Sequence, residues 1–293
     1  MQDFSGKIAV VTGGGSGIGR ALVLQLVAEG CSIAMCDIGD EDMAETTALA
    51  EAQATQGAKI ISFHADVGNE DDIIAFRDYV LAETGEDHIH LLFNNAGIGG
   101  GGSFVAGDRG QWERTFNVCW DGVYLTARAF MPLLVKANEA HIVNVSSVNG
   151  FWASIGPDTP HTAYCAAKFA VKGFTEALLT DLAINAPHVK ASVVMPGHIG
   201  TSIAINSVRE HGVTDILGPG ESEEEVRQRM VDFRDNGMEP AEAAKIILDG
   251  VREEEWRILV GDDAKMLDAA TRTDPKYVLT REFVENAVPT MET

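Results

Sequence analysis

Basic residues are scarce in this chain of 293 residues, because 22 Lys and Arg stand against 44 Asp and Glu and leave a formal net charge of −22. Nucleic acids and anionic membranes are bound through positive protein surfaces, so we expect neither as a partner. No apolar run approaches the length of a transmembrane helix. The N-terminal segment lacks a basic start and a small-residue cleavage site, which predicts a soluble, cytoplasmic protein without a signal peptide.

Cysteine is also rare, and the four residues Cys31, Cys36, Cys119 and Cys165 form no CxxC pair and no metal-type spacing. This pattern predicts reduced, mostly buried thiols rather than a disulfide framework. The eight histidines include no HExxH or similar set of ligands, so we predict no catalytic metal.

What the sequence does contain is a regular alternation of short apolar runs and longer helical stretches. The expected strands are Lys7–Val11, Cys31–Cys36, Lys59–His64, His90–Phe93, His141–Val145, Lys190–Met195 and Trp256–Val260. The expected helices are 17–29, 41–56, 70–83, 111–136, 163–185, 223–235 and 239–253. Strict βα alternation with fully apolar strands predicts a doubly wound parallel sheet covered by helices on both faces, a Rossmann-type α/β fold in three layers.

The domain organisation follows from where this alternation changes. Residues 1–262 are expected to form one domain, and Gly and Pro cluster within 198–238, which we interpret as a helical substrate lid. Residues 263–293 form a polar C-terminal extension with weak helical character.

A glycine-rich loop, Thr12-Gly13-Gly14-Gly15-Ser16-Gly17-Ile18-Gly19, lies between the first expected strand and helix. Its spacing is GxxxGxG rather than GxGxxG. Glycines let the backbone approach a pyrophosphate closely, and the start of a helix offers free N–H groups and a positive dipole. The predicted cofactor contacts from this loop are Gly13, Gly15, Ser16, Gly17, Ile18 and Gly19.

Asp37 ends the second expected strand, 18 residues after Gly19. A carboxylate there can hydrogen-bond both ribose hydroxyls and repels a 2′-phosphate, while Ile38 supplies no cation. We therefore expect NAD rather than NADP. The alternative is that Asp37 is only a helix-capping or turn residue.

A phenol and an ammonium stand four residues apart in Tyr164-Cys165-Ala166-Ala167-Lys168, within an expected helix. Positions i and i+4 share a helix face, so both groups can reach one site, where the cation would lower the pKa of the phenol. An isolated pair of this kind is more often ordinary helix surface.

Further polar segments follow other strands: Asp66-Val67, Asn94-Asn95-Ala96-Gly97, Ser146-Ser147 and Pro196-Gly197-His198-Ile199-Gly200-Thr201. Open α/β sheets bind ligands at the carboxyl ends of their strands. Taken alone, each segment is better explained by turn chemistry or by hydrogen bonding at the end of a strand.

Together these motifs resemble the short-chain dehydrogenase/reductase family, in its single-domain branch, over about residues 5–260. The resemblance implies that Tyr164 is the acid/base and that Lys168 lowers its pKa and binds the nicotinamide ribose. It further implies that Ser147, rather than Ser146, positions the substrate oxygen, and that Asn117 holds a water in a proton relay.

The resemblance also implies further cofactor contacts. Asp66 and Val67 would meet the adenine, and the segment with Asn94, Ala96 and Gly97 would lie under the cofactor. Contacts to the carboxamide and phosphates would come from the turn with Pro196, Gly197, Ile199 and Thr201. Many relatives are tetramers, so we expect a homo-oligomer, either a tetramer or a dimer.

Two departures from the family pattern concern the substrate: the long separation of Ser147 and Tyr164, and the long segment between Gly200 and Pro240, which would form a large lid. Ser147 and Tyr164 are 17 positions apart, longer than usual, with the turn-rich Gly156–His161 between them. The candidates for an apolar substrate wall are Phe104, Phe151, Trp152, Ile155, His198, Ile203 and Ile205. These residues favour a small-molecule substrate that is a secondary alcohol or ketone on a hydrophobic body.

The expected activity is hydride transfer between NAD(H) and such a substrate. Two alternatives stay open on the same fold: an epimerase, dehydratase or carbon–carbon double-bond reductase, and a non-catalytic NAD-binding interaction protein. The GxxxGxG loop with a YxxxK pair counts against the first, and the intact catalytic positions count against the second.

Overall fold

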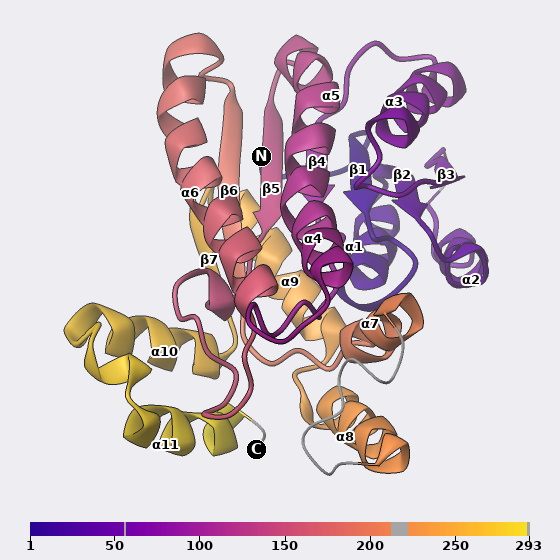
Figure 1. Cartoon of the computed structure of the whole chain (residues 1–293). Helices are drawn as coiled ribbons and strands as arrows, with labels where there is room; N and C mark the ends of the chain where they lie inside the picture. Colours follow the sequence, from indigo (N-terminus) through magenta and orange to yellow (C-terminus); the bar gives the residue numbers. More distant parts are fainter. Residues whose placement is uncertain (56, 212–221, 292–293) are drawn as a thin grey trace.

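The structure is a computed structural model that describes residues 1–55, 57–211 and 222–291. Its centre is a seven-stranded parallel sheet with the order β3-β2-β1-β4-β5-β6-β7 (Figure 1). The strands are β1 (Ile8–Thr12), β2 (Ser32–Asp37), β3 (Ile60–His64), β4 (Leu91–Asn94), β5 (Ala140–Val145), β6 (Val189–Pro196) and β7 (Arg257–Val260). The strand order reverses between β1 and β4, which confirms the predicted doubly wound α/β fold.

Helices cover both faces of the sheet. The helices that follow the strands are α1 (Gly17–Ala28), α2 (Asp40–Glu51), α3 (Glu70–Thr84), α4 (Arg109–Phe116), α5 (Gly122–Lys136), α6 (Thr162–Asn185) and α9 (Pro240–Arg252). The remaining helices are α7 (Ile203–His211), α8 (Glu223–Asn236), α10 (Asp262–Thr273) and α11 (Arg281–Met291). Two short helical turns, η2 (Val148–Gly150) and η4 (Tyr277–Leu279), join them.

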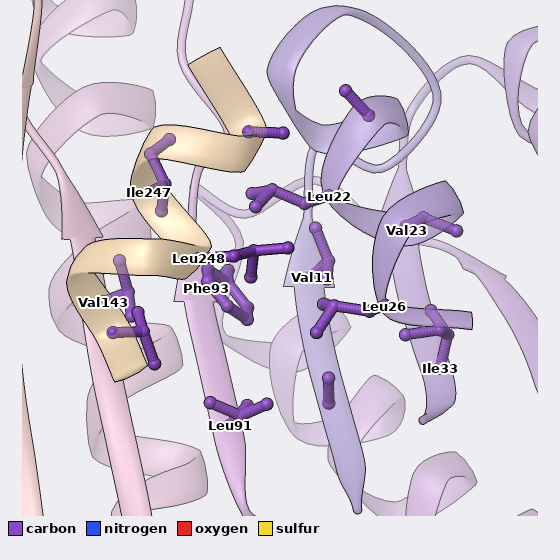
Figure 2. Packing of buried hydrophobic residues seen from close by; sticks show 14 of the residues in the cluster. Val11, Leu22, Val23, Leu26, Ile33, Leu91, Phe93, Val143, Ile247 and Leu248 are labelled. Carbon is purple, nitrogen blue, oxygen red and sulfur yellow. The ribbon is translucent and has the colours of Figure 1, made fainter. Parts of the chain in front are cut away.

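Two apolar layers hold the helices to the sheet. On one face Leu22 and Leu26 of α1 and Leu248 of α9 pack against Val11 and Phe93 of the central strands (Figure 2). On the other face α3, α5 and α6 cover the sheet with side chains such as Phe76, Phe130 and Leu182. Every residue of β1, β4 and β5 is buried. These strands therefore lack the alternation of apolar and polar residues that is typical of a strand with one face in water.

The expected single helix over 111–136 is interrupted. A π-helical turn, η1 (Asn117–Asp121), separates α4 from α5. The continuous helical run Arg109–Lys136 is long and apolar enough to cross a membrane by length and composition, but half of its most apolar window is buried inside the domain. Its apolar residues belong to the core layer of α5, so we interpret this run as a core helix.

The segment expected to be a substrate lid, 198–238, contains α7 and α8, and its part 212–221 lies outside the described residues. Its two ends are joined by a parallel bridge between Ile199 and Met238, with hydrogen bonds from Gly200 N to Met238 O (2.8 Å) and from Met238 N to His198 O (3.0 Å). Gly237 lies against Gly200 so closely that a Cβ atom on either residue would meet the other backbone.

The C-terminal extension departs from the expectation of weak helical character. It forms α10, the turn η4 and α11, which bury Leu267, Val278 and Val284 in a third apolar cluster together with Val148 and Trp152. An amphipathic pattern in a mostly polar segment is enough for a stable helix once a partner surface covers its apolar side.

Candidate functional site

The register of the central strands brings the predicted motifs to one edge of the sheet. Val11 of β1 lies beside Phe93 of β4, and Asn94 lies beside Asn144 of β5. The glycine-rich loop, the segment after β4 and the serines after β5 therefore leave neighbouring strands at the same level.

The glycine-rich loop is held in place by Asn95, a residue that the sequence analysis did not assign to the site. Asn95 Nδ2 donates to Thr12 O (3.0 Å) and Gly13 O (3.3 Å), and Thr12 Oγ1 accepts from the backbone N–H groups of Asn95 and Ala96 (3.0 and 3.1 Å). Asn94, which was expected near the cofactor, points into the sheet, where its Nδ2 donates to Asn144 Oδ1 (2.7 Å). Neighbouring side chains on an extended strand alternate between its two faces, so only one asparagine of the pair can face the loop.

The loop needs glycine for two different reasons. Gly13 and Gly17 have φ angles of 67° and 53°, in the left-handed region that other residues rarely adopt. Gly19 has no room for a side chain, because a Cβ atom there would meet Gly13 O and lie 2.7 Å from Asn95 Nδ2. The loop is further fixed by Arg20, whose Nε and Nη2 donate to Gly15 O (3.0 and 2.7 Å).

The start of α1 can receive an anion. Ser16 is the N-cap residue in an extended conformation, and its side chain makes no capping hydrogen bond to the helix. The first N–H groups of α1 therefore keep their capacity to bind a phosphate, and the helix dipole adds positive potential there. A pyrophosphate-containing cofactor fits this loop, in which Gly13, Gly17 and Gly19 leave the backbone bare.

Asp37 is the turn residue that the sequence allows, and it also borders the glycine-rich loop. Its Oδ2 accepts from Gly15 N (3.0 Å) and its Oδ1 accepts from Gly39 N (3.0 Å). A carboxylate has about four lone-pair positions, which leaves acceptors for ribose hydroxyls. Ile38 is 45% exposed next to it and brings no charge.

Asp66 is tied to the helix across the site. Its Oδ2 forms an ion pair with Arg114 Nη1 of α4 (2.7 Å), and its Oδ1 accepts from Gly68 N (2.9 Å). Val67 beside it is buried against Gly122. These contacts fix the Asp66-Val67 segment in place after β3.

Tyr164 and Lys168 face the same site from the first turns of α6. Lys168 Nζ lies 5.4 Å from the centre of the Tyr164 ring and donates to Val145 O at the end of β5 (2.9 Å). Lys168 is 2% exposed, and burial lowers the pKa of its ammonium. The i and i+4 spacing has placed both groups on one helix face, as the sequence predicts.

The pKa of Tyr164 does not follow the simple expectation that the lysine lowers it. Burial is the largest influence and raises the pKa of the phenol, and a hydrogen bond with the Ser147 side chain opposes that rise. The ring of His161 lies 4.7 Å from the ring of Tyr164, and burial lowers the pKa of His161 to about 4, so this imidazole is neutral at pH 7.

The two serines after β5 have separate partners. Ser146 Oγ donates to Lys168 O (2.8 Å) and thereby fastens β5 to α6. Ser147 Oγ accepts from Asn149 N (3.1 Å), caps the short turn η2 and also reaches Tyr164. Ser147 is therefore the serine whose hydroxyl lies at the phenol.

Asn117 stands at the first position of the π-helical turn. Its Nδ2 donates to Gly68 O (3.2 Å) and to Asp121 Oδ2 (3.2 Å). π-Helical turns inside α-helices are frequent at functional sites because the extra residue redirects a side chain or a carbonyl. Nothing in the sequence pattern of 111–136 signals this turn.

The turn after β6 links the site to both the lid and the extension. His198 N donates to Asp263 Oδ2 of α10 (2.7 Å), and the His198 ring nitrogen Nε2 contacts Phe233 O of α8 (2.6 Å). Thr201 packs against the position of Gly17 in the glycine-rich loop. Ile199 is buried in the core, so its side chain does not face the site.

The expected substrate wall divides into buried and open residues. Trp152 is 1% exposed, and its Nε1 donates to Val278 O (2.7 Å), so it supports the wall from behind rather than lining it. Phe151 and Ile203 are half-buried, whereas Ile155 is 37% and Phe104 76% exposed. A pocket of about 650 Å³ lies between the segment 153–162 and the α6 residues Cys165, Ala166 and Phe169.

Comparison with known proteins decides the family. Residues 7–212 match the family model described as short chain dehydrogenase. The chain belongs to the short-chain dehydrogenase/reductase family. The protein SadH of Mycobacterium tuberculosis is 37% identical over 275 residues, which cover 93% of this chain and 92% of that protein. Estradiol 17-beta-dehydrogenase 11 of Homo sapiens is 32% identical over 232 residues, 78% of this chain and 72% of that protein.

Solved structures of the family agree with the fold. A short-chain dehydrogenase/reductase from Burkholderia phymatum, crystallised with NAD, has a TM-score of 0.82 and 30% identity and covers 96% of this chain and 98% of its own. A metagenomic short-chain oxidoreductase crystallised with NADP has a TM-score of 0.64 and 25% identity and covers 88% of this chain and 97% of its own. The likeness therefore establishes a dinucleotide-binding oxidoreductase family without choosing between the two cofactors.

All four cysteines are free and buried, as the sequence predicts. Burial raises the pKa of the Cys31 and Cys165 thiols to about 12, which keeps them protonated. Among the described residues, no group of three or more His, Cys, Asp or Glu side chains is placed to hold a metal ion.

The crowding at Gly19 gives a direct test of the loop. Gly19→Ala should lower the free energy of unfolding by about 1–3 kcal/mol, because the new methyl group would overlap Gly13 O. Gly173→Ala in α6 is the matched control, since a Cβ atom at Gly173 meets nothing within 4 Å. There the substitution should stabilise by up to about 1 kcal/mol. Urea unfolding measures both, and equal effects at the two positions would contradict the described loop.

Proposed function

We propose that this protein interconverts a secondary alcohol and a ketone on a hydrophobic body, with hydride transfer to or from NAD(H). The observation that carries the proposal is the position of the Tyr164 phenol, which is hydrogen-bonded to Ser147 and next to the buried ammonium of Lys168. NAD would supply the hydride acceptor and donor when bound. It would lie along the glycine-rich loop, Asp37 and the turn after β6.

The chain's own groups would handle the proton. In the oxidation direction Tyr164 Oη takes the hydroxyl proton of the substrate, and Ser147 Oγ holds the substrate oxygen beside it. Lys168 places a positive charge near the phenol and would favour the phenolate once the substrate displaces water. Asn117, at the π-helical turn, would hold a water that passes the proton onward to solvent.

The carboxylate of Asp37 supports NAD over NADP. It faces the glycine-rich loop at the end of β2, where a 2′-phosphate would meet its negative charge. Arg20, the nearby cation, is engaged with Gly15 O and with Glu45 Oε2 (2.7 Å). Because the guanidinium of Arg20 is already bound to these two groups, it is poorly placed to bind a 2′-phosphate as well.

The apolar character of the site supports a hydrophobic substrate. Phe151, Ile155 and Ile203 would form an apolar substrate wall, and the segment 153–162 lines a pocket of about 650 Å³. The related estradiol 17-beta-dehydrogenase 11 is named for a large apolar alcohol, which agrees with this class.

We further propose that the protein works as a homo-oligomer in the cytoplasm. Tyr124 of α5 and Phe169 and Ile184 of α6 are large, exposed apolar residues on helices that cover one face of the sheet. Burying them against a second copy would remove that surface from water. The four free, buried thiols fit a reducing compartment.

Tyr164→Phe tests the proton transfer and the proposal as a whole. A broad panel of secondary alcohols and ketones, assayed with NAD(H) and NADP(H) side by side, should first identify a substrate through NADH absorbance. The variant should then lose about 10²–10⁴-fold in kcat, because the phenylalanine ring cannot accept the proton. Tyr79→Phe on α3, a helix outside both the proposed site and the proposed interface, serves as the control and should retain activity. Full activity of Tyr164→Phe would refute the mechanism.

Ser147→Ala should change the pH dependence as well as the rate. The hydrogen bond from Ser147 lowers the pKa of Tyr164, so its removal raises that pKa. Because alcohol oxidation needs the phenolate, the rise of kcat/KM with pH should move to higher pH in the variant. An unchanged pH profile with reduced activity would mean that Ser147 only orients the substrate.

Asp37→Ser tests the choice of cofactor. Without the carboxylate the repulsion of a 2′-phosphate disappears, and the ribose loses its acceptor. The ratio of kcat/KM for NAD over NADP should fall by about 10-fold or more, since a charge-assisted hydrogen bond is worth about 1.5–3 kcal/mol. Asp40→Ser, whose carboxylate pairs with His64 on the surface, should leave the ratio unchanged. A ratio that does not move in Asp37→Ser would rule out this carboxylate as the selector.

A further inference from the structure

His161 is a polar residue that the proposed reaction does not use, although its ring lies against the ring of Tyr164. The two ring centres are 4.7 Å apart, and the ring planes meet at 32°. His161 is the N-cap residue of α6, yet its side chain makes no capping hydrogen bond to the helix. The imidazole therefore does not serve the helix end and lies beside the phenol instead.

The start of α6 is fixed by hydrogen bonds to the glycine segment that follows β4. Thr162 N and Thr162 Oγ1 both donate to Gly102 O (3.0 and 2.9 Å). Ala163 N donates to Gly101 O (3.2 Å). Two of the N–H groups that the first turn of a helix leaves free are satisfied in this way. The residue just before this turn, His161, is thereby held in a defined position.

His161 also lines the pocket of about 650 Å³, together with the hydroxyl-bearing residues Ser154, Thr159 and Thr162. Among the described residues neither ring nitrogen of His161 has a hydrogen-bonding partner, and neither is a fully buried unpaired atom. The imidazole therefore keeps one donor and one acceptor for a molecule in the pocket. Because this one residue both contacts Tyr164 and lines the pocket, the pocket adjoins the proposed site.

The charges around this ring favour a neutral ligand. Burial lowers the pKa of His161 to about 4, so at pH 7 the imidazole offers no positive charge to an anion. The carboxylate of Asp158, which also lines the pocket, is already paired with Arg281 (3.0 Å). An uncharged donor and acceptor suit a hydroxyl or carbonyl oxygen better than a carboxylate or a phosphate, which bind most strongly to charged donors.

We propose that His161 is a specificity-determining residue that hydrogen-bonds a second oxygen of the substrate, on the carbon next to the reacting one. The inference rests on the proposed alcohol–ketone chemistry and adds the substrate class: neutral vicinal diols and the corresponding hydroxyketones on a hydrophobic body. With the reacting oxygen at Tyr164 Oη, an oxygen on the neighbouring carbon is the one that a ring in contact with the phenol can meet. Cys165 and Phe169 of the pocket would pack against the apolar body.

Three variants separate this role from plain packing of the ring. His161→Phe keeps an aromatic ring beside Tyr164 and removes only the nitrogens. His161→Gln keeps a donor and an acceptor without the ring. His188→Phe is the matched control, because it makes the same change at an imidazole outside the pocket, where the ring contacts Val135 O (2.9 Å).

The first readout is kcat/KM for the oxidation of 2-octanol and of 2,3-octanediol, which share one carbon chain and differ by one hydroxyl. In His161→Phe the value for the diol should fall by about 10-fold or more, because an unmade hydrogen bond at a partly buried site costs about this factor. The value for 2-octanol should stay the same. His161→Gln should recover part of the loss, and His188→Phe should match the wild type.

A second readout does not depend on turnover. 2,3-Octanediol should raise the Tm of the NADH-loaded wild type and of His188→Phe, and this rise should be lost in His161→Phe. If His161→Phe changes the two kcat/KM values equally and keeps the Tm rise, the ring only packs, and the inference is overturned while the proposed function stands. If the wild type oxidises neither alcohol but the Tm rise is lost in His161→Phe, the binding role stands and the proposed reaction fails. If the wild type shows neither oxidation nor a Tm rise, both proposals fail for this substrate class.

Discussion

One buried ammonium joins the chemistry of the site to the framework of the fold. Lys168 Nζ donates to Val145 O, while Ser146 Oγ donates to the carbonyl of Lys168, so α6 and β5 are fastened to each other twice. A cation removed from water is tolerated only where its hydrogen-bonding partners are fixed. Since Tyr164 lies one turn away on the same helix, the position of the phenol depends on this junction. Gly150 allows the chain after β5 to pack this closely against α6, because a Cβ atom at Gly150 would lie 2.8 Å from Lys168 O.

The same junction relates the site to the C-terminal extension. The turn η2 that begins at Val148 leads directly to Trp152, whose indole is held by Val278 and packed by Phe283. The extension therefore packs against the segment that follows Ser147, although it lies at the far end of the chain. On the other side, His198 receives contacts from both α8 and α10, so the lid and the extension meet at a single turn.

Sequence reasoning reached the sheet, the glycine-rich loop and the Tyr164–Lys168 face because each depends on local patterns: apolar runs, glycine spacing and the i, i+4 rule. It could not tell which asparagine of Asn94 and Asn95 holds the loop, because that depends on the strand face each one occupies. The π-helical turn at Asn117 leaves no mark in the apolar pattern of its helix. The burial of Trp152 depends on contacts made more than 100 residues later, which no local window contains.

The bridge between Ile199 and Met238 gives the lid a property of its own. The two ends of the segment, at Ile199 and Met238, are hydrogen-bonded to each other. The segment therefore leaves the domain and returns to it at one place, as a closed loop does. The entropic cost of closing a loop rises only with the logarithm of its length, so residues can be added or removed there with little effect on the sheet. Insertions and deletions between Ile199 and Met238 would therefore leave the sheet and the ends of its strands in place.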